Sequence, residues 1–187
     1  MGTFFYPWYG AGEYRHWREA GHTPPATWAS NYLPDIDPAT FNPARELYDS
    51  RDYEVFKWQV VAMKRAGIQF VIVSWWGIGE YEVEVFRLIL KDYMKRSDNP
   101  YPSLLWAIYY EREGYGDPSI SQLERDIRYI LDNYAQDPNY LKVNGKPVIF
   151  VYGEGDDTFG YVNRWSVVRE ARHLCCLEGL SRLEVCG

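Results

Sequence analysis

Ala-Gly-Ile-Gln-Phe-Val-Ile-Val-Ser-Trp-Trp-Gly, at residues 66–77, is the stretch that decides the fold. Phe70 to Trp75 is a strand-length run rich in aromatic and β-branched residues. Its apolar character is nearly continuous, which is typical of a strand buried on both faces of a parallel sheet. Gly67 stands just before it, where a glycine suits the left-handed end of a helix. The stretch therefore predicts a helix that leads into a buried parallel strand.

Three more runs of the same kind occur along the chain, at Thr3 to Tyr9, Leu104 to Tyr110 and Val148 to Tyr152. Parallel strands need long crossover connections, and apolar residues at helical spacing fill the intervals between these runs. We expect the four strands to be parallel and adjacent in chain order, because right-handed crossovers of this length leave few alternatives. The expected helices are Asp52 to Ala66, about Tyr81 to Arg96, one that opens with a capping box at Ser121 to Glu124, and a weaker pattern from Tyr161 to about Leu177.

The alternation of strands and helices predicts an α/β fold of parallel (β/α) repeats. A complete TIM (β/α)8 barrel takes about 250 residues. The chain has 187 residues, so we expect a single domain over residues 1–187 that forms about half of such a barrel. A small open sheet is the alternative. The tail at residues 173–187 is atypical, since it holds all three cysteines and lacks the pattern of a barrel helix leading into a fifth strand.

Composition and motifs exclude several partners. The chain carries 26 acidic and 20 basic residues, and it lacks the dense basic stripe that binds nucleic acid. No apolar run approaches the roughly 20 residues of a membrane span, and no signal peptide stands at the start of the chain, so we expect a soluble protein of unknown location. The cysteines fit no zinc spacing and no glycine-rich phosphate loop occurs, so neither a metal nor a cofactor is expected.

Aromatic residues make up 18% of the chain, and several stand where a predicted strand ends. In parallel α/β folds, ligands bind beyond the carboxyl ends of the strands, so these side chains are expected to share one rim. Aromatic rings can stack on the C–H faces of a sugar while carboxylates accept its hydroxyl protons. The rim therefore predicts an oligosaccharide or glycan partner. The strand ends are Tyr6 to Gly10, Ser74 to Gly77, Tyr109 to Glu113 and Tyr152 to Asp157.

Individual residues of this rim leave alternatives open. Trp75 and Trp76 are adjacent on a strand and point to opposite faces, so at most one stacks on ligand while the other packs on helices. Glu111 closes an apolar strand, where an unpaired buried carboxylate costs several kcal/mol. It is therefore expected either to function or to pair with an arginine. His16, in the long loop between Gly10 and Arg51, is either a functional or a surface histidine.

Four segments carry a family resemblance: Phe5 to Gly10, Tyr14 to Trp17, Ala66 to Gly77 and Asn144 to Tyr152. In order and spacing over about residues 3–155, they resemble the N-terminal half of glycoside hydrolase family 99, the endo-α-mannosidase and endo-α-mannanase family. The resemblance implies a (β/α)8 barrel that acts inside α-mannosides with retention. It also implies a neighbouring-group mechanism, in which the sugar 2-hydroxyl attacks its own anomeric carbon.

The same resemblance assigns roles to residues. Glu111 matches the glutamate after the third strand that hydrogen-bonds the sugar in the −1 subsite, and it is the catalytic candidate. The family's usual Glu-Pro-Tyr is here Glu111-Arg112-Glu113. By the resemblance, Tyr9, Tyr152 and one tryptophan of the Trp75-Trp76 pair line the donor subsites. With Tyr6 from the rim and His16 from the long loop, the candidate substrate-binding residues are Tyr6, Tyr9, His16, Trp75, Trp76 and Tyr152.

One family feature is absent. The catalytic glutamate pair belongs to a Glu-x-x-Glu stretch in the C-terminal half of the barrel, and no such stretch occurs in this sequence. Glycoside hydrolysis normally needs two spaced carboxylates. Three functions therefore stay open: a hydrolase complete only in a longer chain or when two halves assemble, a carbohydrate-binding half-barrel without catalysis, and a structural or interaction α/β domain. Open barrel edges also predict a homodimer.

Overall fold

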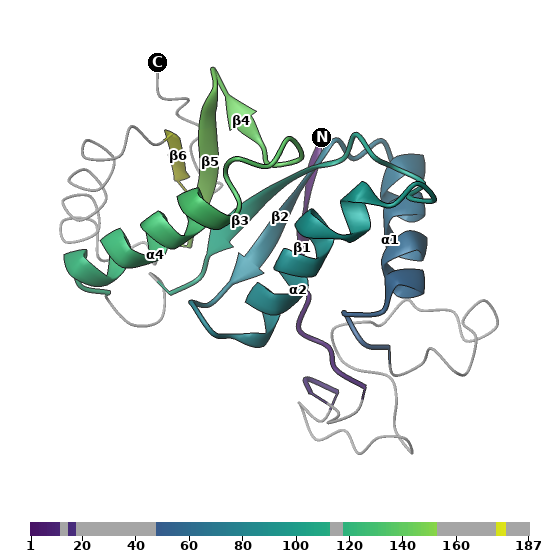
Figure 1. The fold of residues 1–187 in the computed structure, drawn as a ribbon, viewed down its shortest axis with the longest axis horizontal. Helices are drawn as coiled ribbons and strands as arrows, with labels where there is room; N and C mark the ends of the chain where they lie inside the picture. The colour runs from purple at the N-terminus through teal and green to yellow at the C-terminus, as the bar shows by residue number, and fades with distance from the viewer. Residues whose placement is uncertain (12–14, 18–47, 113–117, 153–174, 179–187) are drawn as a thin grey trace.

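The computed structural model describes residues 1–11, 15–17, 48–112, 118–152 and 175–178. Its centre is a sheet of mainly parallel strands, with helices packed against it (Figure 1). None of the helices in these ranges is long and apolar enough to cross a membrane.

The four predicted strands are confirmed: each pairs in parallel with the next, in chain order. The first strand is shorter than predicted, because it ends at Phe5 and not at Tyr9. Pro7 lies in the missing part, and a proline has no N–H group to donate to a strand ladder. The observed strands are β1 (Gly2–Phe5), β2 (Phe70–Trp75), β3 (Leu105–Tyr110) and β5 (Lys146–Val151).

Helix α1 (Tyr53–Arg65) matches its prediction at both ends. The Asp52 side chain accepts a hydrogen bond from the Glu54 backbone N–H, and Gly67 has a φ of 71° just beyond the helix. The second helix is shorter than predicted: α2 (Tyr81–Lys91) is followed by a separate 3₁₀ turn, η3 (Tyr93–Lys95).

Helix α4 (Ile120–Asn133) is present, but the predicted capping box at Ser121 is wrong by two residues. Ser119 is the capping residue, and its side chain accepts from the Gln122 backbone N–H. Ser119 and Gln122 have the same three-residue spacing as Ser121 and Glu124, so the pattern fits at two positions. The path of the chain decides between them, because it places Ser119 directly before the first helical residue, Ile120.

Two further strands were not predicted. β4 (Lys142–Val143) pairs antiparallel with β5 across a tight turn, in which Asn144 and Gly145 have φ values of 52° and 79°. β6 (Cys175–Glu178) pairs in parallel with β5, which corrects the expectation that the tail lacks a fifth strand. The predicted helix from Tyr161 to Leu177 lies outside the described residues up to residue 174, and its last three residues belong to β6.

The sheet has two different faces. Alternate residues of β2 and β3, including Val73, Trp75 and Tyr110, pack in one hydrophobic core with the apolar sides of α1, α2 and α4. The other residues of each strand point to the opposite, inner face. There the rings of Phe70 and Phe150 stack with centroids 6.3 Å apart. The helices therefore cover the outer face, and the inner face carries the aromatic residues that lead up to the rim.

Candidate functional site

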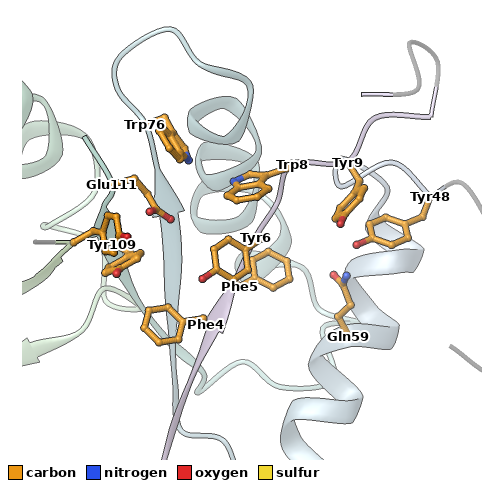
Figure 2. Close-up of a pocket in the computed structure, with 11 residues that line it drawn as sticks. Phe4, Phe5, Tyr6, Trp8, Tyr9, Tyr48, Gln59, Trp76, Tyr109 and Glu111 are labelled. Carbon is orange, nitrogen blue, oxygen red and sulfur yellow. The ribbon is translucent and has the colours of Figure 1, made fainter. Parts of the chain in front are cut away.

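A cavity of about 590 Å³ opens at the carboxyl ends of β1, β2 and β3 (Figure 2). Its volume lies in the range of small-molecule sites, roughly 300–1,000 Å³. Aromatic side chains dominate its wall, and Glu111 is its acidic residue. The residues that line it are Phe4, Phe5, Tyr6, Trp8, Tyr9, Tyr48, Gln59, Trp76, Tyr109, Glu111 and Tyr152. The predicted rim therefore exists, and most of the candidate side chains lie on it.

Glu111 follows β3, and its backbone N–H donates to the Trp75 carbonyl oxygen over 3.1 Å. The residue is only 5% exposed. Burial raises the pKa of its carboxyl group, a hydrogen bond from the Ser74 hydroxyl lowers it, and the nearby Glu82 carboxylate raises it, with a net shift upward. Glu111 is thus a buried acid whose charge is disfavoured by its surroundings.

The arginine next to Glu111 pairs elsewhere. Arg112 Nη1 lies 3.6 Å from Oδ2 of Asp126, a fully buried residue of α4. The Arg112 side chain packs against Gly77, where an added Cβ would stand 2.7 Å from Cζ. Gly77 also has a φ of 132°, a conformation that side chains rarely adopt. Gly77 therefore lets the loop after β2 pass close to Arg112, whose charge is directed to α4.

Two indole side chains meet at Ser74. The indole N–H of Trp8 donates to Ser74 Oγ over 3.0 Å, and the indole N–H of Trp76 donates to the same oxygen over 3.1 Å. The two indole rings meet edge to face, with centroids 6.4 Å apart. Figure 2 shows both rings beside the Glu111 carboxylate, at the same end of the cavity.

Trp75 requires a correction, because the structure places it in the core and not on the cavity. Its side chain is 0% exposed, and its ring stacks on Tyr110 with centroids 5.4 Å apart. The physical reason is strand alternation, which turns Trp75 toward the helices while Trp76 continues into the loop on the cavity side. Trp76 is the member of the pair that lines the cavity.

Tyr6 and Tyr152 both lie on the cavity as predicted in position. Tyr6 is 42% exposed and meets the Trp8 ring edge to face at 4.8 Å. Tyr152 follows β5 and lies 5.9 Å from the Tyr109 ring, between centroids. These rings extend the aromatic wall of the cavity that Glu111 also lines.

Tyr9 and His16 belong to a second group of rings. Tyr9 is 5% exposed and packs against Trp17 and Tyr48, with centroids 4.5 and 5.3 Å away. The His16 ring is 5.1 Å from Trp8 and 6.2 Å from Tyr9. His16 does not itself line the cavity, so it contributes by packing against two residues that do.

Ser74 and Glu82 hold residues of the cavity wall in place, and sequence reasoning missed both. Glu82 is 2% exposed, and its Oε1 accepts from the Trp76 backbone N–H over 3.2 Å. Burial raises the pKa of its carboxyl group. Both residues carry a sequence signal: Ser74 is the one polar residue of an apolar strand, and Glu82 falls in the apolar pattern of a helix with Phe86 and Ile89. Lone polar groups on buried faces are either bonded or functional.

Across the described part of the chain, no group of three or more His, Cys, Asp or Glu side chains could hold a metal ion. Glu113, Glu154, Asp156 and Asp157 lie outside the described residues.

Comparison with protein families decides the relationship. A family model described as Glycosyl hydrolase family 99 matches residues 1–168. The chain belongs to this family. Its fold is accordingly a partial (β/α) barrel, in which the parallel strands β1, β2, β3 and β5 run in chain order.

Curated relatives in the family are distant in sequence. Mouse glycoprotein endo-alpha-1,2-mannosidase is 25% identical over 174 residues, which cover 80% of this chain and 36% of that protein. The human glycoprotein endo-alpha-1,2-mannosidase-like protein is 23% identical over 182 residues, with the same coverage. The chain thus spans about a third of the length of these relatives.

Solved structures agree with the fold. A GH99 endo-alpha-mannosidase from Bacteroides thetaiotaomicron, in complex with bis-tris propane, matches with a TM-score of 0.65 at 22% identity. The match covers 95% of this chain and 51% of that one. A second structure of a GH99 endo-alpha-mannosidase from this bacterium matches with a TM-score of 0.54 at 24% identity.

Proposed function

We propose that the cavity is an α-mannoside subsite of a family 99 glycosidase of the endo, retaining type. One observation carries this: the Glu111 carboxyl group and the Trp8 and Trp76 rings face the same cavity of about 590 Å³. The curated relatives named for endo-α-1,2-mannosidase activity support the choice of sugar.

The chemistry of the wall suits a pyranose. Its apolar C–H face packs on aromatic rings, and its hydroxyl groups donate to a buried carboxylate that few water molecules reach. Glu111 is 5% exposed, so a sugar hydroxyl that donates to it replaces a scarce hydrogen bond. In this proposal Glu111 binds the sugar whose anomeric carbon reacts, and Tyr6, Tyr9, Trp76 and Tyr152 line the subsites.

Turnover needs more groups than binding does. In the retaining mechanism, the 2-hydroxyl oxygen bonds to the anomeric carbon while the bond to the leaving oxygen breaks. One carboxylate takes the hydroxyl proton and a carboxylic acid protonates the leaving oxygen. The sequence lacks the family's Glu-x-x-Glu pair that would do this. We therefore propose a chain that binds α-mannosides and cleaves them only when the remaining carboxylates are supplied.

The alternative is a carbohydrate-binding half-barrel that never cleaves. Titration of the 187-residue chain with an α-1,2-linked mannotriose tests binding, and a reducing-sugar assay on the same samples tests cleavage. We expect binding that Glu111→Gln weakens and the α-glucose analogue maltotriose fails to reproduce. Trp58→Ala is the control, because Trp58 is 51% exposed on α1 and does not line the cavity. Equal binding of both trisaccharides would refute the proposal.

We also propose that the chain forms a homodimer through its sheet edges. Within the described residues, β1 pairs only with β2, so its other edge presents unpaired backbone groups. Pairing of two sheets across this edge would bury those groups together with the aromatic inner face. Light scattering at micromolar concentration is expected to show a dimer, and a stable monomer would contradict the proposal.

A further inference from the structure

Ser74 is a buried polar residue in an otherwise apolar strand. It is 1% exposed and stands between Val73 and Trp75 on β2. Its neighbour across the sheet is Tyr109 of β3, which lines the cavity. A buried hydroxyl without partners costs free energy, so its hydrogen bonds account for its presence.

The hydrogen bonds of Ser74 saturate its oxygen. A serine hydroxyl has two acceptor lone pairs and one proton to donate. Both acceptor positions are taken, by the indole N–H groups of Trp8 and Trp76 at 3.0 and 3.1 Å. The single proton then has Glu111 as its acceptor, because the Ser74 hydroxyl lowers the pKa of that carboxyl group. The direction of each bond follows from the chemistry of the donors, because an indole nitrogen can only donate.

The three partners come from different parts of the chain. Trp8 follows β1, Trp76 follows β2, and Glu111 follows β3. One hydroxyl in the middle strand thus joins the carboxyl ends of three adjacent strands. Figure 2 shows the two indoles and the Glu111 carboxylate gathered at one end of the cavity.

We propose that Ser74 is a positioning residue that fixes two indole rings and one carboxylate of the sugar site through a single hydroxyl. The inference rests on the proposed function for its ligand, but not for its geometry. It also narrows how a ligand is recognised. Because both indole N–H groups are bonded to Ser74, Trp8 and Trp76 offer a ligand ring surface and no donor. The site therefore takes the apolar face of a sugar at the indoles, and accepts hydroxyl protons at Glu111.

The first test needs no ligand and no variant. In the intact chain, nuclear magnetic resonance signals of the Trp8 and Trp76 indole N–H groups are expected to exchange slowly with water. Trp58, which is 51% exposed, provides the fast reference. Exchange at Trp8 and Trp76 as fast as at Trp58 would overturn the proposal. Because this test uses the intact chain, it does not depend on whether any variant folds.

The second test compares three variants without ligand. Ser74→Ala should shift both indole signals and speed their exchange by about tenfold, since each loses its acceptor. It should also raise the pKa of Glu111, because the lowering bond is lost while burial and the charge of Glu82 remain. The variant leaves other ionisable side chains near Glu111 in place. Tyr109 and Tyr152 line the same cavity, and Arg112 pairs with Asp126.

Ser74→Thr keeps the hydroxyl and should rescue both readouts. Ser50→Ala is the matched control: it removes another buried serine hydroxyl, which accepts from the Tyr9 backbone N–H over 3.1 Å and contacts no indole nitrogen. It should leave both indole signals and the pKa of Glu111 unchanged. Unchanged signals in Ser74→Ala would overturn the positioning role.

The third test adds α-1,2-linked mannotriose. Ser74→Ala should weaken its binding about tenfold, and Ser74→Thr should restore it. If the intact chain binds no mannotriose but the ligand-free signals respond to Ser74→Ala, the proposed function fails and the positioning role stands. If the intact chain binds mannotriose and Ser74→Ala binds it equally well, the positioning role fails.

Discussion

Trp75 and Trp76 are neighbours in sequence and have opposite tasks. Trp75 is fully buried and stacks on Tyr110 beneath the helices. Trp76 lines the cavity, and its indole N–H is bonded to Ser74. A single step along the chain crosses from the face of the sheet that stabilises the fold to the edge that holds the candidate site.

The same division separates Tyr110 and Tyr109 on the next strand. Tyr110 is fully buried, and its hydroxyl donates to Asp126 Oδ2 of α4 over 2.9 Å. Tyr109 lines the cavity and meets the Phe4 ring edge to face at 5.0 Å. Two adjacent strands thus repeat one rule: identical residue types serve the core or the site according to their face. Substituting each member of a pair separates stability from binding.

The largest effect is expected for Trp75→Ala, which leaves a ring-sized cavity in the core. Substitution of a buried tryptophan by alanine costs about 3–5 kcal/mol of unfolding free energy. Urea denaturation followed by circular dichroism measures the loss. Trp76→Ala, the matched variant, should lose clearly less. Equal losses in the two variants would break the distinction between the faces.

Trp76→Ala should act on binding. Loss of one aromatic platform is expected to weaken α-1,2-linked mannotriose binding by about 1–3 kcal/mol, the range of ring stacking on an aromatic side chain. Isothermal titration calorimetry measures the affinity, with Trp58→Ala as the surface control. Undiminished affinity in Trp76→Ala would return this ring to a purely structural role.

Tyr110→Phe tests how much the outer face contributes to stability, because it removes only the Tyr110 hydroxyl group. Asp126 is 0% exposed and would lose a hydrogen-bond donor, which costs about 1–3 kcal/mol for a buried acceptor. Chemical denaturation of Tyr110→Phe and Tyr109→Phe side by side should show the larger loss in Tyr110→Phe. The reverse order would mean that the inner face contributes more to stability than its position suggests.

Glu111→Gln gives the smallest effect, and the size of this effect depends on pH. The pKa of Glu111 is raised in the folded chain above the ordinary value of 4.5, so folding disfavours the ionised form. This penalty is fully present above the raised pKa and disappears below the ordinary value. Glu111→Gln should therefore melt higher than the native chain at pH 7, with a difference that narrows toward pH 4. A constant difference across this range would show that Glu111 does not cause it.

Much of the fold follows from local pattern. The four apolar runs predicted the parallel strands, and Gly67 and Asp52 marked the ends of α1. The capping box at Ser121 failed because the same spacing begins at Ser119, and only the chain path decides between them. Strand β6 was missed because Cys175 to Leu177 were assigned to the weaker helical pattern that begins at Tyr161.

The site was predicted in place but not in detail. Strand ends located Tyr6, Trp76, Glu111 and Tyr152 on one rim, since parallel topology brings them together. Strand alternation predicted that Trp75 and Trp76 point to opposite faces of the sheet. It did not predict which of them faces the cavity, because that depends on which side of the sheet the helices cover. The contact of Ser74 with three residues is a matter of tertiary geometry, which no spacing in the sequence encodes.

The β4–β5 hairpin also has a consequence for the order of folding. Its Asn144-Gly145 turn brings Val143 against Lys146, a contact that closes within microseconds in small hairpins. The pairing of β1 with β2 instead joins Gly2 to Phe70. The chain between these two residues must lose conformational entropy before the strand contacts can stabilise it. We therefore expect the first strand of the sequence to be the last to dock. Trp8 follows that strand, so the indole pair on Ser74 would assemble only at the final step.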